Sequence, residues 1–206
     1  MKSKFLVIII LLLFGCKKGQ GDFVLKGKIT DSTFSQAHSG ATVQLYKVPT
    51  GTTEQILIGT TVLNSTGEYS FTFPRDKMEK FIIKVEKEGY FEIFESIYFS
   101  TLTLKEDNIR NYSTTAKGWI KIRVKNDNPL PTDYFHFIKQ QGKANCAECC
   151  PIEQQTYYGS LDTTIYCIND GNTVYSIYYF GTGMSSGTID GVTTTAFDTT
   201  ELVINY

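Results

Sequence analysis

The chain has no marked excess of charge and very few histidines, and each shortage argues against a class of function. It carries 20 Lys and Arg against 21 Asp and Glu, so its formal net charge is −1. A chain so close to neutral has no basic field to attract a phosphate backbone, and we therefore expect no nucleic-acid partner. The H-E-x-x-H motif, the phosphate-binding loop, the dinucleotide-binding fingerprint and the EF-hand loop are also missing from the sequence. We expect no cofactor.

The sequence also lacks an amphipathic helix of useful length. Almost every segment after residue 22 instead alternates apolar and polar residues with a period of two, which is typical of half-buried strands. Clear examples are DFVLKGKIT (22–30), EYSFTF (68–73), WIKIRVK (119–125) and ELVINY (201–206). Gly-containing turn signals such as Ser39-Gly40 and Glu88-Gly89 separate these segments. The pattern predicts an all-β protein.

A polar stretch divides the strand-rich sequence into halves of similar size. It reads KEDNIRNYSTTAK and covers residues 105–117. Each half is close to the usual length for one small core, and short strands at this spacing are typical of sandwiches. We therefore predict two β-sandwich domains in series, 22–104 and 118–206, joined by a linker at 105–117.

The first residues, MKSKFLVIIILLLFGCKKG, are the one long apolar stretch of the chain. Lys2 and Lys4 form a basic start that precedes an apolar run at 5–14. A run of about ten residues is too short to cross a bilayer as a helix, which takes roughly twenty. A basic start followed by a short apolar run is typical of a signal peptide.

The end of this run resembles the lipobox of bacterial lipoproteins. The matching residues are Leu13-Phe14-Gly15-Cys16. The resemblance implies that the signal peptide, 1–15, is removed, that Cys16 is acylated, and that 16–21 form a lipidated tether. The partner would then be a membrane, reached through acyl chains on Cys16. We expect a location in the cell envelope, on the outer membrane. Related lipoproteins carry an acidic run after the acylated cysteine as a signal for surface export. No such run follows Cys16, so we expect the protein to face the periplasm.

Four further cysteines are an even number, as a disulfide framework requires. They are Cys146, Cys149, Cys150 and Cys167. An envelope protein meets an oxidising environment, where disulfides persist, and we predict structural disulfides. A Cys149–Cys150 bridge between neighbours would be strained, so either Cys149 or Cys150 pairs with Cys167. A zinc site and a redox centre are the alternatives, but a second C-x-x-C or Cys/His pair is missing, and no helix is expected after Pro151.

The first half resembles the carboxypeptidase regulatory-like (transthyretin-like) domain. The segments that carry the resemblance are GKITD (27–31), SGATVQL (39–45), STGEYSF (65–71) and IKVEKEGY (83–90). It implies a seven-stranded Greek-key sandwich that serves as an accessory domain and has no catalytic residues. The start and end of the second half are similar to C-terminal β-domains of Bacteroidota-type lipoproteins, whose function is generally unassigned.

One short motif suggests a small hydrolase. Gly183-Met184-Ser185-Ser186-Gly187 matches the G-x-S-x-G nucleophile elbow, which needs a following helix and a later histidine. Residues 188–197 are rich in Thr and Gly, and the last histidine is His136. A hairpin loop explains the match, and we predict no catalytic residue and no enzyme. We expect His38 to be a solvated residue of a turn and His136 to be a residue of a strand. No metal ligand is assigned.

Aromatic residues are abundant, with 13 Tyr, 14 Phe and 1 Trp. Aromatic side chains on an exposed sheet can stack on sugar rings or anchor a protein partner, although core packing is their usual role. We assign Tyr157, Tyr158 and Trp119 as candidate ligand-binding residues. The sequence thus predicts a non-enzymatic, lipid-anchored binding or scaffold module of the cell envelope. A carbohydrate-binding module of a glycan-handling system is the alternative, and a small hydrolase a further one.

Overall fold

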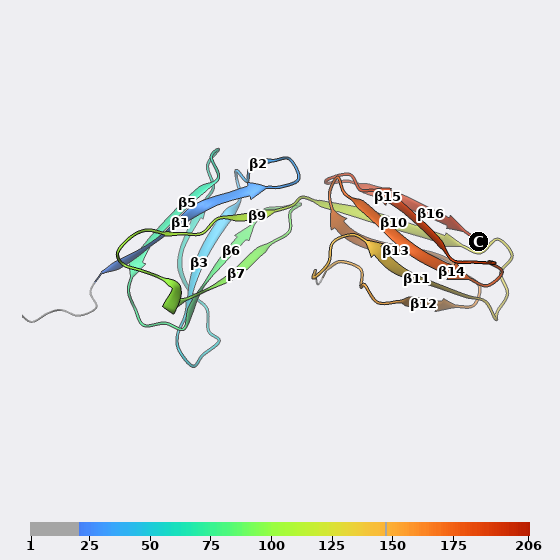
Figure 1. The fold of residues 1–206 in the computed structure, drawn as a ribbon, viewed down its shortest axis with the longest axis horizontal. Coiled ribbons are helices and arrows are strands. Elements are labelled where there is room, and N and C mark those ends of the chain that lie inside the picture. The colour runs from blue at the N-terminus through green and yellow to red at the C-terminus, as the bar shows by residue number, and fades with distance from the viewer. Residues whose placement is uncertain (1–20, 147) are drawn as a thin grey trace, which may run out of the picture.

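The computed structural model describes residues 21–146 and 148–206, and Figure 1 shows two β-sandwiches in series. The predicted all-β class is confirmed, as are the two sandwich domains. The signal peptide at 1–15, Cys16 and all of the 16–21 tether except Gly21 lie outside the described residues. Within the described part of the chain, no helix has the length and apolarity needed to span a membrane.

The first sandwich contains two sheets, four-stranded β4-β3-β6-β7 and a second sheet built around β1. Its elements are β1 (Asp22–Asp31), β2 (Gln36–Ala37), β3 (Thr42–Val48), β4 (Ile56–Val62), β5 (Glu68–Pro74), β6 (Lys80–Glu86), β7 (Ile93–Tyr98), the 3-10 helix η1 (Phe99–Thr101), β8 (Asn108–Ile109) and β9 (Tyr112–Thr114). The described part of this sandwich thus has nine strand segments rather than seven: six longer strands and the short β2, β8 and β9, which pair with β1.

The alternation read in the sequence matches the burial of these strands. In β5, the side chains of Tyr69, Phe71 and Phe73 are buried, while the residues between them are exposed. Strand β1 pairs with β5 in an antiparallel ladder that sets Phe23 opposite Phe73 and Leu25 opposite Phe71. Residues opposite one another in a ladder point to the same face, so both strands turn their apolar side chains into one core.

The segment 105–117 differs from the linker that we expected. Its strands β8 and β9 pair in parallel with β1, so the first sandwich continues to Thr114. Asn108 is buried and its side-chain amide donates hydrogen bonds to the carbonyls of Val24 and Thr103. A side chain on Gly27 would clash with the Arg110 carbonyl. The polar composition of the segment therefore reflects an edge that is held by hydrogen bonds.

The second sandwich consists of the sheets β13-β10-β16 and β12-β11-β14-β15. Its strands are β10 (Lys117–Lys125), β11 (Tyr134–Gln141), β12 (Gln155–Tyr158), β13 (Asp162–Asp170), β14 (Val174–Gly181), β15 (Thr188–Thr193) and β16 (Thr199–Asn205). Strand β10 is central, antiparallel to β13 and parallel to β16. The core between the sheets contains Ile120 and Ile122 from β10 and Phe135 and Phe137 from β11.

Candidate functional site

The outer face of the β12-β11-β14-β15 sheet is lined with aromatic side chains. Register sets Tyr134 of β11 opposite Tyr158 of β12, and His136 of β11 opposite Phe180 of β14. Their strand neighbours Phe135 and Tyr179 are buried, so these side chains point away from the core. We call the outward side chains of this sheet the aromatic face: Tyr134, His136, Ile138, Tyr158, Tyr178, Phe180 and Ile189.

The rings of the aromatic face are grouped on three neighbouring strands. The ring planes of Tyr134 and His136 are 12° from parallel, with centroids 6.0 Å apart. Phe180 lies beside both, 6.1 Å from Tyr134 and 5.6 Å from His136 between ring centroids. Tyr158 is 81% exposed and Ile189 66% exposed, whereas the three grouped residues are half-buried. The result is a rigid aromatic group with freely accessible side chains at two edges.

The aromatic face carries no permanent charge. By register, the remaining outward positions of the sheet are Thr156, Gln141, Ser176, Val174, Gly191 and Thr193. None of these outward positions in the described sheet is Asp, Glu, Lys or Arg. A side chain on Gly187 would occupy the place of the Tyr178 phenol, so glycine lets this ring lie across the start of β15. A surface of rings and hydroxyl groups can stack on apolar faces and exchange hydrogen bonds.

The structure separates the three residues that we assigned from sequence. Tyr158 belongs to the aromatic face. Its neighbour Tyr157 points inward, packs against the core, and stacks on Phe137 with centroids 6.4 Å apart and planes 8° from parallel. Trp119 lies half-buried on the outer side of β10, in the opposite sheet. The three candidates therefore do not share one face of the second sandwich, because strand alternation sends adjacent tyrosines to opposite faces.

The four described cysteines form two disulfides, as predicted. Cys146 pairs with Cys149 and Cys150 with Cys167, which decides between the two pairings left open. The Cα atoms of Cys150 and Cys167 are 5.1 Å apart. No cluster of three or more metal-binding side chains occurs among the described residues. The cysteine cluster is therefore a staple of the second sandwich.

The other residues considered from sequence have structural roles or lie apart. Ser185 is exposed in the loop between β14 and β15, and a strand follows it, as the hairpin interpretation predicted. His38 is buried at 1% exposure against the Tyr90 ring, so the expectation of a solvated turn residue is wrong. Burial also raises the pKa of Tyr175 to about 12, and its hydroxyl group donates to Cys167 Sγ at 3.4 Å.

The sequence interpretation missed most of the aromatic face. Tyr134, His136, Tyr178 and Phe180 lie at alternating positions of YFHFI (134–138) and YYF (178–180). In these runs every residue is apolar or aromatic, so composition does not distinguish the core face from the outer face. Only the packing of Phe135 and Phe137 in the core shows that His136, which lies between them, points outward. The sequence shows that the side chains of these strands alternate between two faces, but it does not show which face is buried.

Comparisons with known proteins identify no family for this chain. No protein-family model matches it, and no curated protein does. Among solved structures, it is similar to the Bacillus anthracis TIE protein, with TM-score 0.35 and 11% identity over 90% of this chain, and spans 34% of that protein. It is also similar to the minor pilin of Streptococcus agalactiae, with TM-score 0.35 and 11% identity over 89% of this chain and 94% of that one.

A third similar structure is the shaft pilin of Lactobacillus rhamnosus GG, with TM-score 0.33 and 9% identity over 90% of this chain and 97% of that one. Pilin-type all-β proteins thus recur among the structural neighbours. Scores this low do not bear on what the chain binds. The resemblance of residues 22–104 to the carboxypeptidase regulatory-like domain stays a prediction.

Proposed function

We propose that this chain is a non-enzymatic, lipid-anchored protein of the cell envelope that binds a glycan on the aromatic face of its second sandwich. The observation that carries the proposal is the group formed by Tyr134, His136 and Phe180 on an outward, uncharged sheet surface with Tyr158 at its edge. Sugar rings present apolar C–H faces and a periphery of hydroxyl groups. Aromatic planes bordered by Thr, Ser and Tyr hydroxyl groups match both features without any charge.

Uncharged surroundings favour a neutral glycan over an ionic ligand. The centre of the aromatic face is occupied by the His136 ring, which lies alongside the Tyr134 and Phe180 rings. An ionic ligand bound there would lose hydration without gaining a partner of opposite charge. A neutral sugar loses less hydration on binding, and its apolar C–H face can pack against the exposed rings.

The binding test uses the full-length, lipidated protein in detergent and a panel of soluble probes: β-glucan, xylan, chitin oligosaccharides and solubilised peptidoglycan fragments. Isothermal titration is expected to detect binding to at least one of them. Tyr158→Ala should weaken that binding about tenfold, since 1.4 kcal/mol corresponds to a factor of ten. Tyr166→Ala is the matched control, because Tyr166 is 66% exposed on the outer face of the opposite sheet.

Equal losses in Tyr158→Ala and Tyr166→Ala would show that the aromatic face is not the binding surface. If none of the probes binds, the glycan assignment is wrong. The second candidate, a protein partner, is favoured by Ile138 and Ile189, which extend the aromatic face with aliphatic surface. Capture from the native envelope that depends on Tyr158 and not on Tyr166 would support that candidate.

The anchor is a separate part of the proposal and has its own test. The lipobox-like Leu13-Phe14-Gly15-Cys16 supports acylation of Cys16 and attachment to the outer membrane, facing the periplasm. Cys16→Ser should abolish incorporation of a labelled fatty acid and leave the precursor uncut. Undiminished labelling of the Cys16→Ser variant would rule out this anchor while leaving the glycan test unaffected.

A further inference from the structure

The chain between the two sandwiches is hydrogen-bonded on both sides. Phe91 N–H of the first sandwich donates to the Thr115 carbonyl at 3.1 Å, and Lys117 N–H donates to the Gly89 carbonyl at 2.7 Å. On the other side, Gly171 N–H of the second sandwich donates to the Ala116 carbonyl at 2.7 Å. Residues 115–117 therefore belong to both sandwiches, and they leave no free linker.

Aromatic rings from both sandwiches pack beside this segment. Phe34 of the first sandwich stacks on Phe197 of the second, with centroids 5.8 Å apart and planes 19° from parallel. Tyr90 of the first sandwich meets Phe197 edge-on at 5.2 Å between centroids. Phe197 has φ of 66°, a left-handed conformation that costs a bulky residue about 1–3 kcal/mol. Such a conformation persists only where the surrounding contacts hold it.

Two lysines of the second sandwich reach the same ring of the first. Lys143 Nζ lies 4.1 Å from the centroid of Phe91, and Lys117 Nζ lies 5.4 Å from it. Each ammonium group also has a carboxylate partner in the second sandwich: Asp170 at 2.7 Å for Lys143 and Glu148 at 2.8 Å for Lys117. A cation held over a ring contributes about 0.5–1 kcal/mol at an exposed site and more when desolvated. Phe91 is buried.

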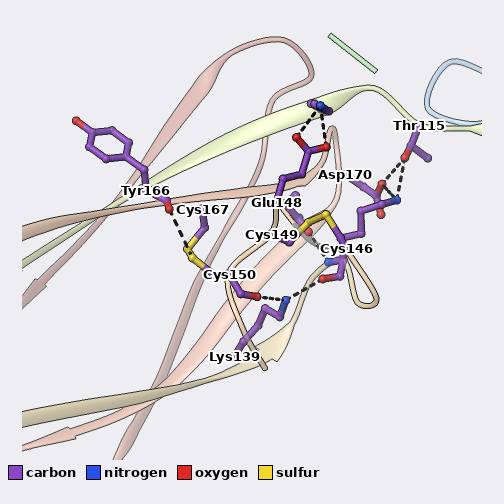
Figure 2. Close-up of a disulfide and its surroundings, with 12 residues drawn as sticks. Thr115, Lys139, Cys146, Glu148, Cys149, Cys150, Tyr166, Cys167 and Asp170 are labelled. Atoms are coloured by element: carbon purple, nitrogen blue, oxygen red, sulfur yellow. Dashed lines mark hydrogen bonds and ion pairs between the residues drawn. A yellow bond between two sulfur atoms is a disulfide. The ribbon is translucent and has the colours of Figure 1, made fainter. Parts of the chain in front are cut away.

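The disulfides hold the loop that supplies these contacts. We call residues 142–146 and 148–150 the latch loop, which contains Lys143 and Glu148. Figure 2 shows that Cys150 joins its end to Cys167 on β13, three residues before Asp170. Lys139 Nζ donates to the carbonyls of Lys143 at 2.8 Å and Cys150 at 2.7 Å, which ties the two ends of the loop together. The start of the loop is fixed by Lys143 N–H, which donates to Asn169 Oδ1 at 2.6 Å.

We propose that the latch loop is a redox-sensitive lock on the angle between the two sandwiches. With Cys150–Cys167 closed, Lys143 is held between Asp170, Thr115 and Phe91, and the sandwiches move as one body. When the bond is cut, the loop regains chain entropy and Lys143 leaves Phe91. The junction then keeps its backbone hydrogen bonds, the hydrogen bond from Thr115 to Asp170, the contact of Lys117 with Phe91 and the strained Phe197 stack, and it becomes a hinge.

A dithiol reductant opens the lock in a balanced exchange. Its thiolate attacks one sulfur of Cys150–Cys167, which breaks the S–S bond, forms a mixed disulfide and releases the other cysteine as a thiolate. The second thiol of the reductant then attacks the mixed disulfide. Both cysteines end as thiols, and the dithiol ends as a cyclic disulfide, so two electrons and two protons pass from the reductant to the protein.

The lock also governs the shape of a groove between the sandwiches. The groove has a volume of about 990 Å³ and is lined by Lys87, Glu88 and Glu92 of the first sandwich and by Lys117, Lys143 and Glu148 of the second. The wall on the side of the second sandwich therefore contains Lys143 and Glu148 of the latch loop. Opening the lock changes the distance between these walls, and with it the direction in which the second sandwich presents its aromatic face.

The test is hydrogen exchange of the full-length protein, oxidised and after treatment with dithiothreitol. The probes are the backbone amides of Phe91, Lys117 and Phe197, which donate across or beside the junction. We expect these amides to exchange at least tenfold faster after reduction, while the amides of β1 and of residues 120–125 in β10 keep their protection. Cys150→Ser/Cys167→Ser should reproduce this effect without reductant. Cys146→Ser/Cys149→Ser should change exchange less than twofold, because that bridge does not reach β13.

A lysine pair separates the lock from general loss of structure. Lys143→Met removes the charge but keeps both disulfides, and it should speed junction exchange severalfold in the oxidised protein. Lys121→Met is the matched control, because Lys121 pairs with Glu201 on the outer side of β10. If reduction also exposes β10, the Lys143→Met result decides. Unchanged junction exchange in Lys143→Met, or unchanged exchange after reduction, would overturn the proposal.

Discussion

The two sandwiches distribute their aromatic residues differently. In the first, the rings are inside: Phe73 lies 5.8 Å from Phe23 and 4.8 Å from Phe81 between centroids, and all three are buried. In the second, rings such as Phe135 also lie in the core, but one sheet turns others, such as Phe180, outward. Aromatic residues therefore contribute to both cores, and in the second sandwich the alternation of β11 and β14 also places a group of them on the surface.

The outer faces of the two sandwiches differ in charge as well. In the first, Lys84 of the outward β6 face pairs with Glu86 at 2.8 Å and with Glu92 at 3.6 Å. Ion pairs of this exposed kind add little stability, but they keep a sheet surface hydrated and discourage association. The aromatic face has no such pairs among its described residues. A surface left apolar in this way is typical of a binding site.

The smaller core is the one with disulfides. Fifteen buried residues form the core cluster of the first sandwich and eleven that of the second. A small core supplies less burial to offset the conformational entropy lost on folding. Closing the 17-residue separation between Cys150 and Cys167 can contribute about 3 kcal/mol in the chain-entropy model. The staple thus adds stability to the sandwich that has the smaller core.

Substitutions within each core are expected to cause the largest loss in the free energy of unfolding. Phe81 and Phe137 are each 1% exposed, and a Phe→Ala change in a core costs about 3–5 kcal/mol. Because Trp119 is the only tryptophan and lies in the second sandwich, its fluorescence reports unfolding there. Phe137→Ala should lower the urea midpoint of that signal strongly. Phe81→Ala should act mainly on the circular dichroism of the first sandwich.

The extent to which Phe81→Ala also shifts the Trp119 signal measures the coupling between the sandwiches. A closed lock predicts that the two transitions approach one another in the oxidised protein and separate in the reduced protein. If the two unfolding midpoints are equally far apart in the oxidised and the reduced protein, the junction does not couple the stability of the two sandwiches. The sandwiches would then unfold as independent units.

A glycine pair tests the junction at intermediate cost. Gly89 and Gly40 both have φ of 78°, but an added Cβ at Gly89 would lie 2.8 Å from Phe197 Cδ1, whereas at Gly40 it would meet nothing within 4 Å. Both Gly→Ala changes carry about 1–2 kcal/mol for the left-handed conformation. Only Gly89→Ala should also speed exchange at the Phe197 amide. Equal exchange in both variants would mean that Phe197 packing does not hold the junction.

The smallest expected effect is a dependence of stability on pH that is specific to the first sandwich. Burial and the nearby Lys87 charge lower the pKa of His38, so the folded state resists protonation more than the unfolded state does. The contribution of His38 is complete above its ordinary pKa of about 6.5 and is lost as pH falls below that value. His38→Gln should flatten this slope in thermal unfolding. An unchanged slope in His38→Gln would contradict this assignment.

Much of the architecture could be predicted from sequence because strand alternation and turn glycines are local properties. The period of two located β5, β10 and β16, and the even cysteine count indicated disulfides before any pairing was known. The Ser185 loop followed from the same reasoning, since a nucleophile elbow needs a helix that the local sequence does not form. These features depend on neighbours within a few residues.

Tertiary structure alone decided three other features. It placed β8 and β9 beside β1. The polar composition of this segment predicted a linker, and only the folded structure brings the Asn108 side chain to the buried carbonyl of Val24. It chose Cys150 rather than Cys149 as the partner of Cys167. It also set the phase of β11, so that Tyr134 and His136 face outward and Phe135 faces the core. In an all-apolar strand, alternation defines two faces, and only packing against a second sheet determines which one is buried.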